Sequence, residues 1–258
     1  MSSSVFNTNS YHKPTFTVII QARMGSTRLP GKALLDLSGK PMLAHVIERS
    51  KAISGISSVV LATGSINENR ALIDLANSMD IHAFSGSDEN VLERFYKAAE
   101  VYGGDYIVRI TGDNPFMDPE YATYSINTAK IHEPDLCSII NLPLGVAIEI
   151  IKRQALITAY ENSDKQYQFE HVTPYIKENV NKFHIFREKI SYQNPFHDLR
   201  LTVDEKKDYQ LASIIYRALY QGSIFSLKQI IDYLSQNPDL IQINRDVHQK
   251  SMKETSQS

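Results

Sequence analysis

The chain has 258 residues, enough for one large α/β domain or two small ones. Its composition, with 42% hydrophobic and 22% charged residues, is ordinary for a soluble enzyme. The formal net charge of -2 provides no overall field that would attract nucleic acid or a membrane surface, so we expect neither as a partner. A single cysteine, Cys137, excludes an intrachain disulfide. With no signal-peptide pattern and no apolar run long enough to span a bilayer, we predict a cytoplasmic protein.

In the first 135 residues, short runs rich in β-branched residues alternate with stretches of helical periodicity. Strands are predicted at 16–20, 57–63, 81–84 and 105–110. Helices are predicted from Pro41, over 66–79 and 91–102, and from Asp118-Pro119, where an N-cap precedes a proline in the first turn. We expect the turn at 85–88 to cap the helix that follows it. Regular β-α alternation predicts a mostly parallel sheet with helices on both faces.

The second half of the chain is less regular and indicates an antiparallel excursion between Cys137 and Val203. The predicted strands are 136–140, 146–151, 183–186 and 199–203, and the predicted helices 154–161, 169–177, 208–220 and 226–234. We therefore predict a three-layer α/β fold with a twisted, mostly parallel sheet. A single domain is expected over residues 15–245, with disordered tails at 1–14 and 246–258.

A cationic loop follows the first predicted strand. Between Gln21 and Lys32 it carries Arg23, Arg28 and Lys32 and no acidic residue. Ligands of open α/β sheets bind beyond the carboxyl ends of the strands, where arginine forks and a lysine point charge suit phosphate oxygens. No Walker or dinucleotide glycine pattern is present, so side chains would meet the phosphate charge. We predict a phosphate-binding loop; the alternative is a solvated basic surface loop.

Two aspartates, Asp113 and Asp204, each follow a predicted strand. Mg²⁺ bound with a nucleotide takes one or two carboxylates together with phosphate oxygens. The pair therefore suits a metal site if the two strands are neighbours, which the sequence alone does not establish. The alternative for each is a helix N-cap, a frequent role for aspartate after a strand.

These motifs resemble a known family. The stretch from Gln21 to Arg49, with Gly39-Lys40-Pro41-Met42 before its helix, is similar to the opening of bacterial cytidylyltransferases of the spore-coat-polysaccharide type, and more distantly of the 3-deoxy-manno-octulosonate (Kdo) and acylneuraminate types. The segments 109–119 and 199–204 resemble two further motifs of the family. The resemblance covers residues 18–220. It implies a Rossmann-like nucleotidyltransferase fold related to that of GT-A glycosyltransferases.

The resemblance also implies roles for particular residues. Asp113 and Asp204 would bind Mg²⁺ and, with Arg28 and Lys32, form the catalytic set. Glu149, His171 and Arg200 would contact the acceptor. The implied nucleotide-binding residues are Gln21, Ala22, Arg23, Met24, Gly25, Ser26, Arg28, Lys32, Thr63, Ser85, Gly86, Ser87, Arg109, Thr111 and Gly112.

Two positions depart from the family pattern. Ala147 stands where an acidic residue is usual, so that only Glu149 remains of a Gly-x-Asp-x-Glu motif. After Asp204, the usual Thr-Pro-Glu-Asp is replaced by residues 205–208, at a helix start. For His171, an interior or capping histidine is the alternative to substrate contact.

The resemblance implies an Mg²⁺-dependent cytidylyltransferase. It would transfer CMP from CTP to an acidic or phosphorylated sugar or polyol, release pyrophosphate, and serve surface polysaccharide or glycan biosynthesis. We expect a homodimer. One alternative is a GT-A-type glycosyltransferase, although an Asp-x-Asp pattern is absent after the middle strand. The other is a nucleotide-binding subunit that has lost catalysis, which only Ala147 favours.

Overall fold

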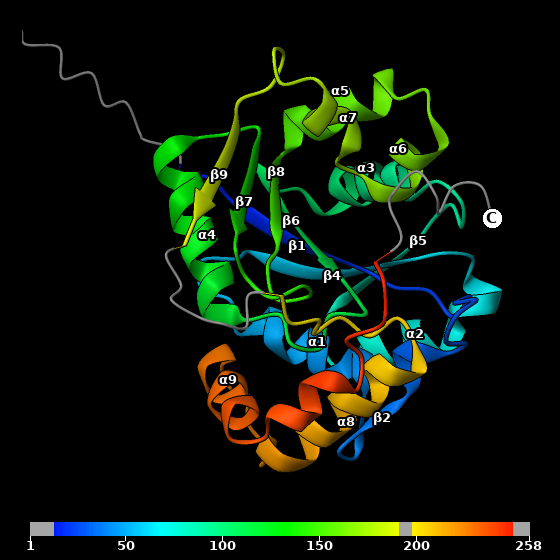
Figure 1. Ribbon diagram of the computed structural model, residues 1–258. Coiled ribbons are helices and arrows are strands. Elements are labelled where there is room, and N and C mark those ends of the chain that lie inside the picture. Colours follow the sequence, from blue (N-terminus) through cyan, green and yellow to red (C-terminus); the bar gives the residue numbers. More distant parts are fainter. Residues whose placement is uncertain (1–12, 191–197, 250–258) are drawn as a thin grey trace, which may run out of the picture.

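A seven-stranded β-sheet runs through the centre of the molecule, with helices against both of its faces (Figure 1). The structure is a computed structural model that describes residues 13–190 and 198–249. The strand order is β5-β4-β1-β6-β8-β7-β9. Within this sheet, β8 is antiparallel to its neighbours, β6 and β7, and the other strand pairs are parallel. The mostly parallel sheet with an antiparallel excursion is therefore confirmed. The described helices include none long and apolar enough to cross a membrane.

The strands and helices follow the predicted order along the chain. The strands are β1 Phe16–Gln21, β2 Asp36–Leu37, β3 Lys40–Pro41, β4 Ser58–Thr63, β5 His82–Ser85, β6 Tyr106–Thr111, β7 Leu136–Ile140, β8 Glu149–Lys152 and β9 Ile185–Lys189. The helices are α1 Met42–Lys51, α2 Ile66–Ser78, α3 Val91–Tyr102, α4 Pro119–His132, α5 Arg153–Asn162, α6 Gln166–His171, α7 Pro174–Glu178, α8 Lys206–Leu219 and α9 Leu227–Gln236, with short 3-10 helices at η1 Lys32–Leu34 and η2 Pro238–Gln242.

Alternation along the strands divides the core into two layers. In β1, Val18 and Ile20 pack with residues of α1, α2 and α4, whereas Ile19 packs with residues of α3, α5 and α7 on the opposite face. Successive side chains of a strand point to opposite faces, so a strand covered on both sides is apolar throughout. Every residue of β1 except the last is buried, as its continuous apolar run predicted.

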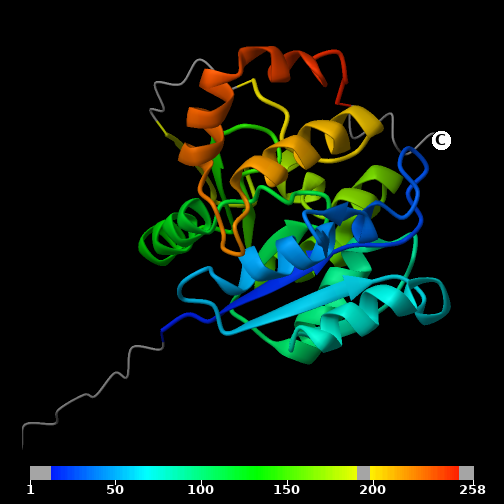
Figure 2. The same ribbon diagram turned by 90° about the horizontal axis from the view of Figure 1, so that it is seen from below.

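A third cluster lies outside the helix layer that contains α1. Helices α8 and α9 pack there over Leu37, Met42 and the chain around Leu201 (Figure 2). Tyr216 of α8 is fully buried, and its hydroxyl donates to the carbonyl of Pro115 at 2.6 Å. The last third of the chain is thereby attached to the segment that follows β6.

Three local predictions were wrong. The helix predicted at 169–177 is two helices, α6 and α7, separated at Val172, whose φ of 69° lies in the left-handed region before Pro174. The N-cap of α3 is Asn90, whose side chain accepts from the amide of Glu93, and not a residue of the turn at 85–88. Residues 199–203 join no sheet strand and form only an isolated bridge between Arg200 and Leu144.

The predicted tails fall largely outside the described residues, at 1–12 and 250–258. Two described residues of the predicted C-terminal tail make contacts with the rest of the chain. Asp246 pairs with Lys207, and Gln249 accepts a hydrogen bond from Arg200.

Candidate functional site

In the cationic loop between β1 and η1, hydrogen bonds to one residue, Met24, turn the chain back. The carbonyl of Met24 accepts hydrogen bonds from the amides of Ser26, at 2.9 Å, and Gly31, at 3.3 Å. Gly31 has a φ of 67°, which suits glycine, and it begins the 3-10 helix that carries Lys32. The loop thus returns Lys32 toward the carboxyl edge of the sheet.

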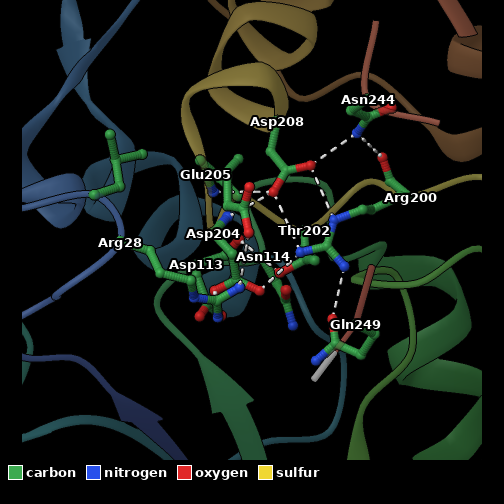
Figure 3. A network of polar contacts seen from close by, with 12 residues as sticks. Arg28, Asp113, Asn114, Arg200, Thr202, Asp204, Glu205, Asp208, Asn244 and Gln249 are labelled. Carbon is green, nitrogen blue, oxygen red and sulfur yellow. Dashed lines mark hydrogen bonds and ion pairs between the residues drawn. The ribbon is translucent and has the colours of Figure 1, made fainter. Parts of the chain in front are cut away.

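The Lys32 ammonium lies between the two predicted metal ligands. Its Nζ is 2.9 Å from Asp113 Oδ2 and 2.8 Å from Asp204 Oδ1, and it also donates to the carbonyl of Val203 at 3.0 Å. Arg28 reaches Asp204 Oδ1 as well, at 3.2 Å. Figure 3 shows Arg28, Asp113 and Asp204 together at this point. The two aspartates, which are 91 positions apart in the sequence, are close enough for one cation to contact both.

The charges of this cluster support one another. Burial works against a charge on Lys32, but Asp113 and Asp204 outweigh it and raise the pKa of the ammonium above its usual value. Burial likewise favours a neutral Asp204, yet Lys32, Arg28 and Arg200 hold the pKa of its carboxyl below the usual value. Both Lys32 and Asp204 are therefore charged at neutral pH.

Neither aspartate serves as a helix N-cap. Helix α4 is capped by Asp118, whose Oδ1 accepts from the amide of Glu120, as predicted. Helix α8 has Glu205 as its N-cap. The capping alternative for Asp113 and Asp204 is thus excluded.

Asp204 is held in place by Asp208 and by backbone bonds rather than by a sheet strand. The amide of Val203 donates to the carbonyl of Asp113 at 2.8 Å, which fixes the two segments side by side. Asp208 Oδ2 accepts from the amides of Asp204 and Glu205, both at 3.0 Å. This carboxylate replaces sheet pairing in setting the position of Asp204.

Arg200 extends the same network away from the loop (Figure 3). Its guanidinium donates to Asp208 Oδ1 and Asp204 Oδ2, each at 2.9 Å, and to Gln249 at 2.6 Å. The Asn244 side-chain amide donates to both Arg200 O and Asp208 Oδ1. The side chain of Arg200 is only 7% exposed. These contacts suit a residue that orients Asp204, and direct acceptor contact by Arg200 stays a prediction.

The predicted nucleotide-binding residues Thr63 and Ser85 to Ser87 lie at the ends of β4 and β5, where hydrogen bonds join the two segments. The amide of Gly86 donates to the carbonyl of Thr63 at 3.0 Å, and the Ser85 hydroxyl donates to the carbonyl of Gly64 at 2.7 Å. Ser87 accepts from the amide of Asn90. Two buried acceptors at the neighbouring strand ends, Gln21 Oε1 and Thr63 Oγ1, have no hydrogen-bond partner among the described residues. Unpaired buried polar atoms are costly, which marks this edge as a place for a polar ligand.

Gly112 allows the end of β6 to approach the cationic loop closely. Its amide donates to Gln21 O at 2.8 Å, and a Cβ atom there would lie 2.8 Å from the Ala22 Cβ. Thr111 accepts from the Asn114 side chain at 2.7 Å. A glycine is thus required at the second position of the Thr-Gly-Asp motif.

Two of the predicted contact residues, Arg109 and Glu149, pair with each other across β6 and β8, at 3.0 Å. Lys177 and Thr173 also contact the Glu149 carboxylate. Burial opposes ionisation of Glu149, but Arg109 and Lys177 outweigh it and lower its pKa. The group carries one net positive charge. His171, half-buried at the end of α6, lies in the segment just before Thr173.

Sequence reasoning did not identify three side chains that organise the site. Asn69 is buried in α2 and bonds to Met24 and Ser65. Asp88 accepts from the Ser65 amide with both oxygens, and the buried Arg94 donates to Ser87 O at 2.9 Å. Burial and the nearby Arg23 lower the pKa of Arg94 to about 10. No pattern in the sequence indicates these contacts, since each joins segments brought together only by the fold.

The site offers the carboxylates of Asp113 and Asp204 as ligands for Mg²⁺. Among the described residues there is no cluster of three or more His, Cys, Asp or Glu side chains that could enclose a metal ion. Asp113 Oδ2 and Asp204 Oδ1, however, both lie within 3 Å of one nitrogen, so a single cation can reach both. Two carboxylates completed by phosphate oxygens and water are the usual set for nucleotide-bound Mg²⁺. The residues present therefore fit that ion.

Comparison with known proteins gives concordant matches. A family model described as "Cytidylyltransferase" matches residues 17–249. The chain is 34% identical over 227 residues to the spore coat polysaccharide biosynthesis protein SpsF of Bacillus subtilis, covering 86% of this chain and 94% of that protein. It is 38% identical over 108 residues to a 3-deoxy-manno-octulosonate cytidylyltransferase of Idiomarina loihiensis, covering 41% of this chain and 42% of that one. The solved structure of a cytidylyltransferase from Leptospira borgpetersenii superposes with a TM-score of 0.82 at 28% identity, over 92% of this chain and 100% of that one.

Proposed function

This chain belongs to the cytidylyltransferase family, whose members are nucleotidyltransferases, and from that premise we propose that it transfers CMP from CTP to an anionic acceptor with release of pyrophosphate. The observation that carries the proposal is the meeting of Lys32, Asp113 and Asp204 at the carboxyl edge of the sheet. Cations that can hold a triphosphate thereby adjoin carboxylates that can hold its metal.

The residues of the candidate site have distinct roles in this proposed reaction. The acceptor hydroxyl attacks the α-phosphorus of CTP in line, the new P–O bond forms as the bond to pyrophosphate breaks, and the hydroxyl proton passes to solvent water. Arg23, Arg28 and Lys32 hold the β- and γ-phosphates and neutralise the departing charge. Mg²⁺ held by Asp113 and Asp204 would neutralise charge on the α-phosphate. The protein contributes mainly position and preorganised charge.

We propose that the base is recognised at the ends of β4 and β5. The unpartnered Thr63 Oγ1 and the backbone from Ser85 to Ser87 supply polar groups there. Cytosine presents an amine donor where uracil presents a carbonyl acceptor, so a fixed backbone group distinguishes the two.

The acceptor is proposed to be an acidic or phosphorylated sugar or polyol used in surface polysaccharide or glycan biosynthesis. The relatives support this class, since one is named for spore coat polysaccharide biosynthesis and another for 3-deoxy-manno-octulosonate. The net positive charge of Arg109, Glu149 and Lys177 also suits an anionic acceptor. Family membership favours nucleotidyl transfer over the glycosyltransferase alternative. The presence of both aspartates beside the loop cations opposes loss of catalysis.

The decisive experiment measures pyrophosphate release from CTP, ATP, GTP and UTP with a panel of acidic sugars and sugar phosphates. We expect release with CTP and one acceptor class only, dependent on Mg²⁺ and abolished by EDTA. A pyrophosphate-exchange assay with CTP adds a second readout, because only a nucleotidyltransferase incorporates labelled pyrophosphate. Tight CTP binding without exchange across the whole panel would instead support a non-catalytic nucleotide-binding subunit.

A further inference from the structure

Asn69 occupies an unusual position in α2. Its side chain is buried, at 1% exposure, although asparagine is a poor helix former and most buried helix positions are apolar. Its backbone, with φ -114° and ψ 16°, departs from helical values in the middle of the first turns of the helix. A polar residue at a distorted and buried position indicates a requirement other than helix stability.

Both polar atoms of the Asn69 side chain are used, and they face two different loops. Oδ1 accepts from the amide of Met24, and Nδ2 donates to the carbonyl of Ser65, each at 2.9 Å. The Ser65 bond is local to the start of α2. The bond to Met24 joins α2 to the cationic loop. Stabilising the helix does not require such a bond.

On the Met24 side, this contact holds the residue on which the loop is folded. The Met24 carbonyl accepts from Ser26 and Gly31, and Gly31 leads directly into the turn that carries Lys32. The bond from Asn69 holds Met24 by its amide, and the carbonyl of Met24 holds the rest of the loop. Fixing Met24 therefore fixes the path of the loop from Arg23 to Lys32.

On the Ser65 side, the contact reaches the segments proposed for the base. The Ser65 amide donates to Asp88 at 3.0 and 3.1 Å, and the adjoining Gly64 carbonyl accepts from Ser85. A Cβ on Gly64 would lie 1.6 Å from Asp88 Oδ1 and 3.2 Å from Asn69 Nδ2. The packing is too tight for these segments to move independently.

We propose that Asn69 is a positioning residue that couples the phosphate end of the nucleotide site to its base end. The inference rests on the proposed binding of CTP. It assigns to one buried side chain, which acts through Met24 and Ser65, the relative placement of the two halves of the site. Ligands that occupy only one half, such as pyrophosphate or CMP, should therefore both depend on Asn69.

The test compares Asn69→Ala and Asn69→Leu with the wild-type chain by calorimetry, using pyrophosphate, CMP and CTP. Each variant should bind both pyrophosphate and CMP roughly 3- to 10-fold more weakly, the equivalent of one lost hydrogen bond for each loop. Asn67→Ala is the matched control, because Asn67 is the same residue type, exposed, two positions away on α2. Lys32→Met should weaken pyrophosphate alone, and Ser85→Ala should weaken CMP alone.

A second measurement uses the wild-type protein and does not depend on how the variants fold. The Met24 amide should be protected from hydrogen exchange, and CMP, which lacks the β- and γ-phosphates, should slow its exchange further. Loss of only one ligand's affinity in the Asn69 variants, a lower melting temperature with unchanged affinities, or Met24 exchange unaffected by CMP would overturn the coupling. If wild-type protein bound none of the three ligands, the proposed function itself would fail.

Discussion

Replacing Asp113 or Asp204 by asparagine should abolish most turnover, but only Asp204→Asn should substantially destabilise the fold. Asp113 has a side chain that is 27% exposed and contacts one cation, Lys32. Asp204 is 9% exposed and contacts Lys32, Arg28 and Arg200. The two substitutions remove the same charge from very different surroundings.

The difference in unfolding free energy follows from these contacts. A partly exposed ion pair contributes at most about 1 kcal/mol, which sets the expected cost of Asp113→Asn. In Asp204→Asn, the NH₂ group of the new side chain would face a cation on one side of the residue. Removing one partner of a buried ion pair lowers the unfolding free energy by about 3–5 kcal/mol. Because Arg200 keeps Asp208, and Lys32 keeps Asp113, we expect about 2–4 kcal/mol. At about 2–4 °C per kcal/mol for a chain near this size, the melting temperature should fall by roughly 4–16 °C.

Both quantities can be measured on the same samples. Urea unfolding in EDTA without nucleotide gives the stability difference, and pyrophosphate release at saturating Mg²⁺ gives turnover. The double variant should be little slower than either single one, because the two aspartates are proposed to hold one metal ion and residues that serve one metal act as a unit. Equal destabilisation by the two substitutions, or near-normal turnover in either, would refute the arrangement described here.

Three further predictions address the cationic loop, recognition of the base, and the half-buried Glu149. Arg28→Ala should weaken CTP binding about 10- to 150-fold in calorimetry, the cost of a charge-assisted contact of roughly 1.5–3 kcal/mol; unchanged affinity would remove Arg28 from the phosphate site. CTP should exceed UTP by at least about 100-fold in kcat/KM, and equal turnover would exclude base recognition by fixed backbone groups. The pKa of Glu149 is lower in the folded chain than its ordinary value of 4.5, so its stabilising contribution is present above that value and is lost as pH falls through the folded pKa. Glu149→Gln should therefore flatten the loss of stability between roughly pH 5 and pH 3 in urea unfolding, and a pH profile identical to that of the wild type would contradict the pairing with Arg109 and Lys177.

Local patterns were sufficient to predict most of the secondary structure. The apolar runs of β1, β4 and β6 and the amphipathic helices between them required a parallel sheet covered on both faces. The same reasoning failed at residues 199–203. These residues alternate between apolar and polar and are all buried, as in a strand, but Leu199, Leu201 and Val203 pack with residues of α8 and α9 and not within the seven-stranded sheet. Burial produces the same sequence pattern in both settings.

The candidate site was predictable where one residue type limits the chemistry, and not where the fold brings segments together. Asp113 and Asp204 could be identified as candidates, but their proximity depends on the bond from Val203 to Asp113 O, which no local signal encodes. In the sequence, Asn69 is only a residue of low helix propensity, and its role becomes evident from its contact with Met24. Arg200 carries a charge typical of substrate contact, and only its burial against Asp208 indicates a supporting role.

The position of Asn244 has a consequence for how the protein is made. Asp204 is oriented through Arg200 and Asp208, and Asn244, whose side chain bonds to both of these residues, is near the end of the described chain. A ribosome adds roughly 5–20 residues per second, so the segment carrying Lys32 and Asp113 emerges on the order of ten seconds before Asn244 does. During that interval the growing chain can form β1, β4 and β6 without a finished catalytic centre. Active protein is therefore expected only after Asn244 has been synthesised, and chains terminated before this residue are expected to be inert.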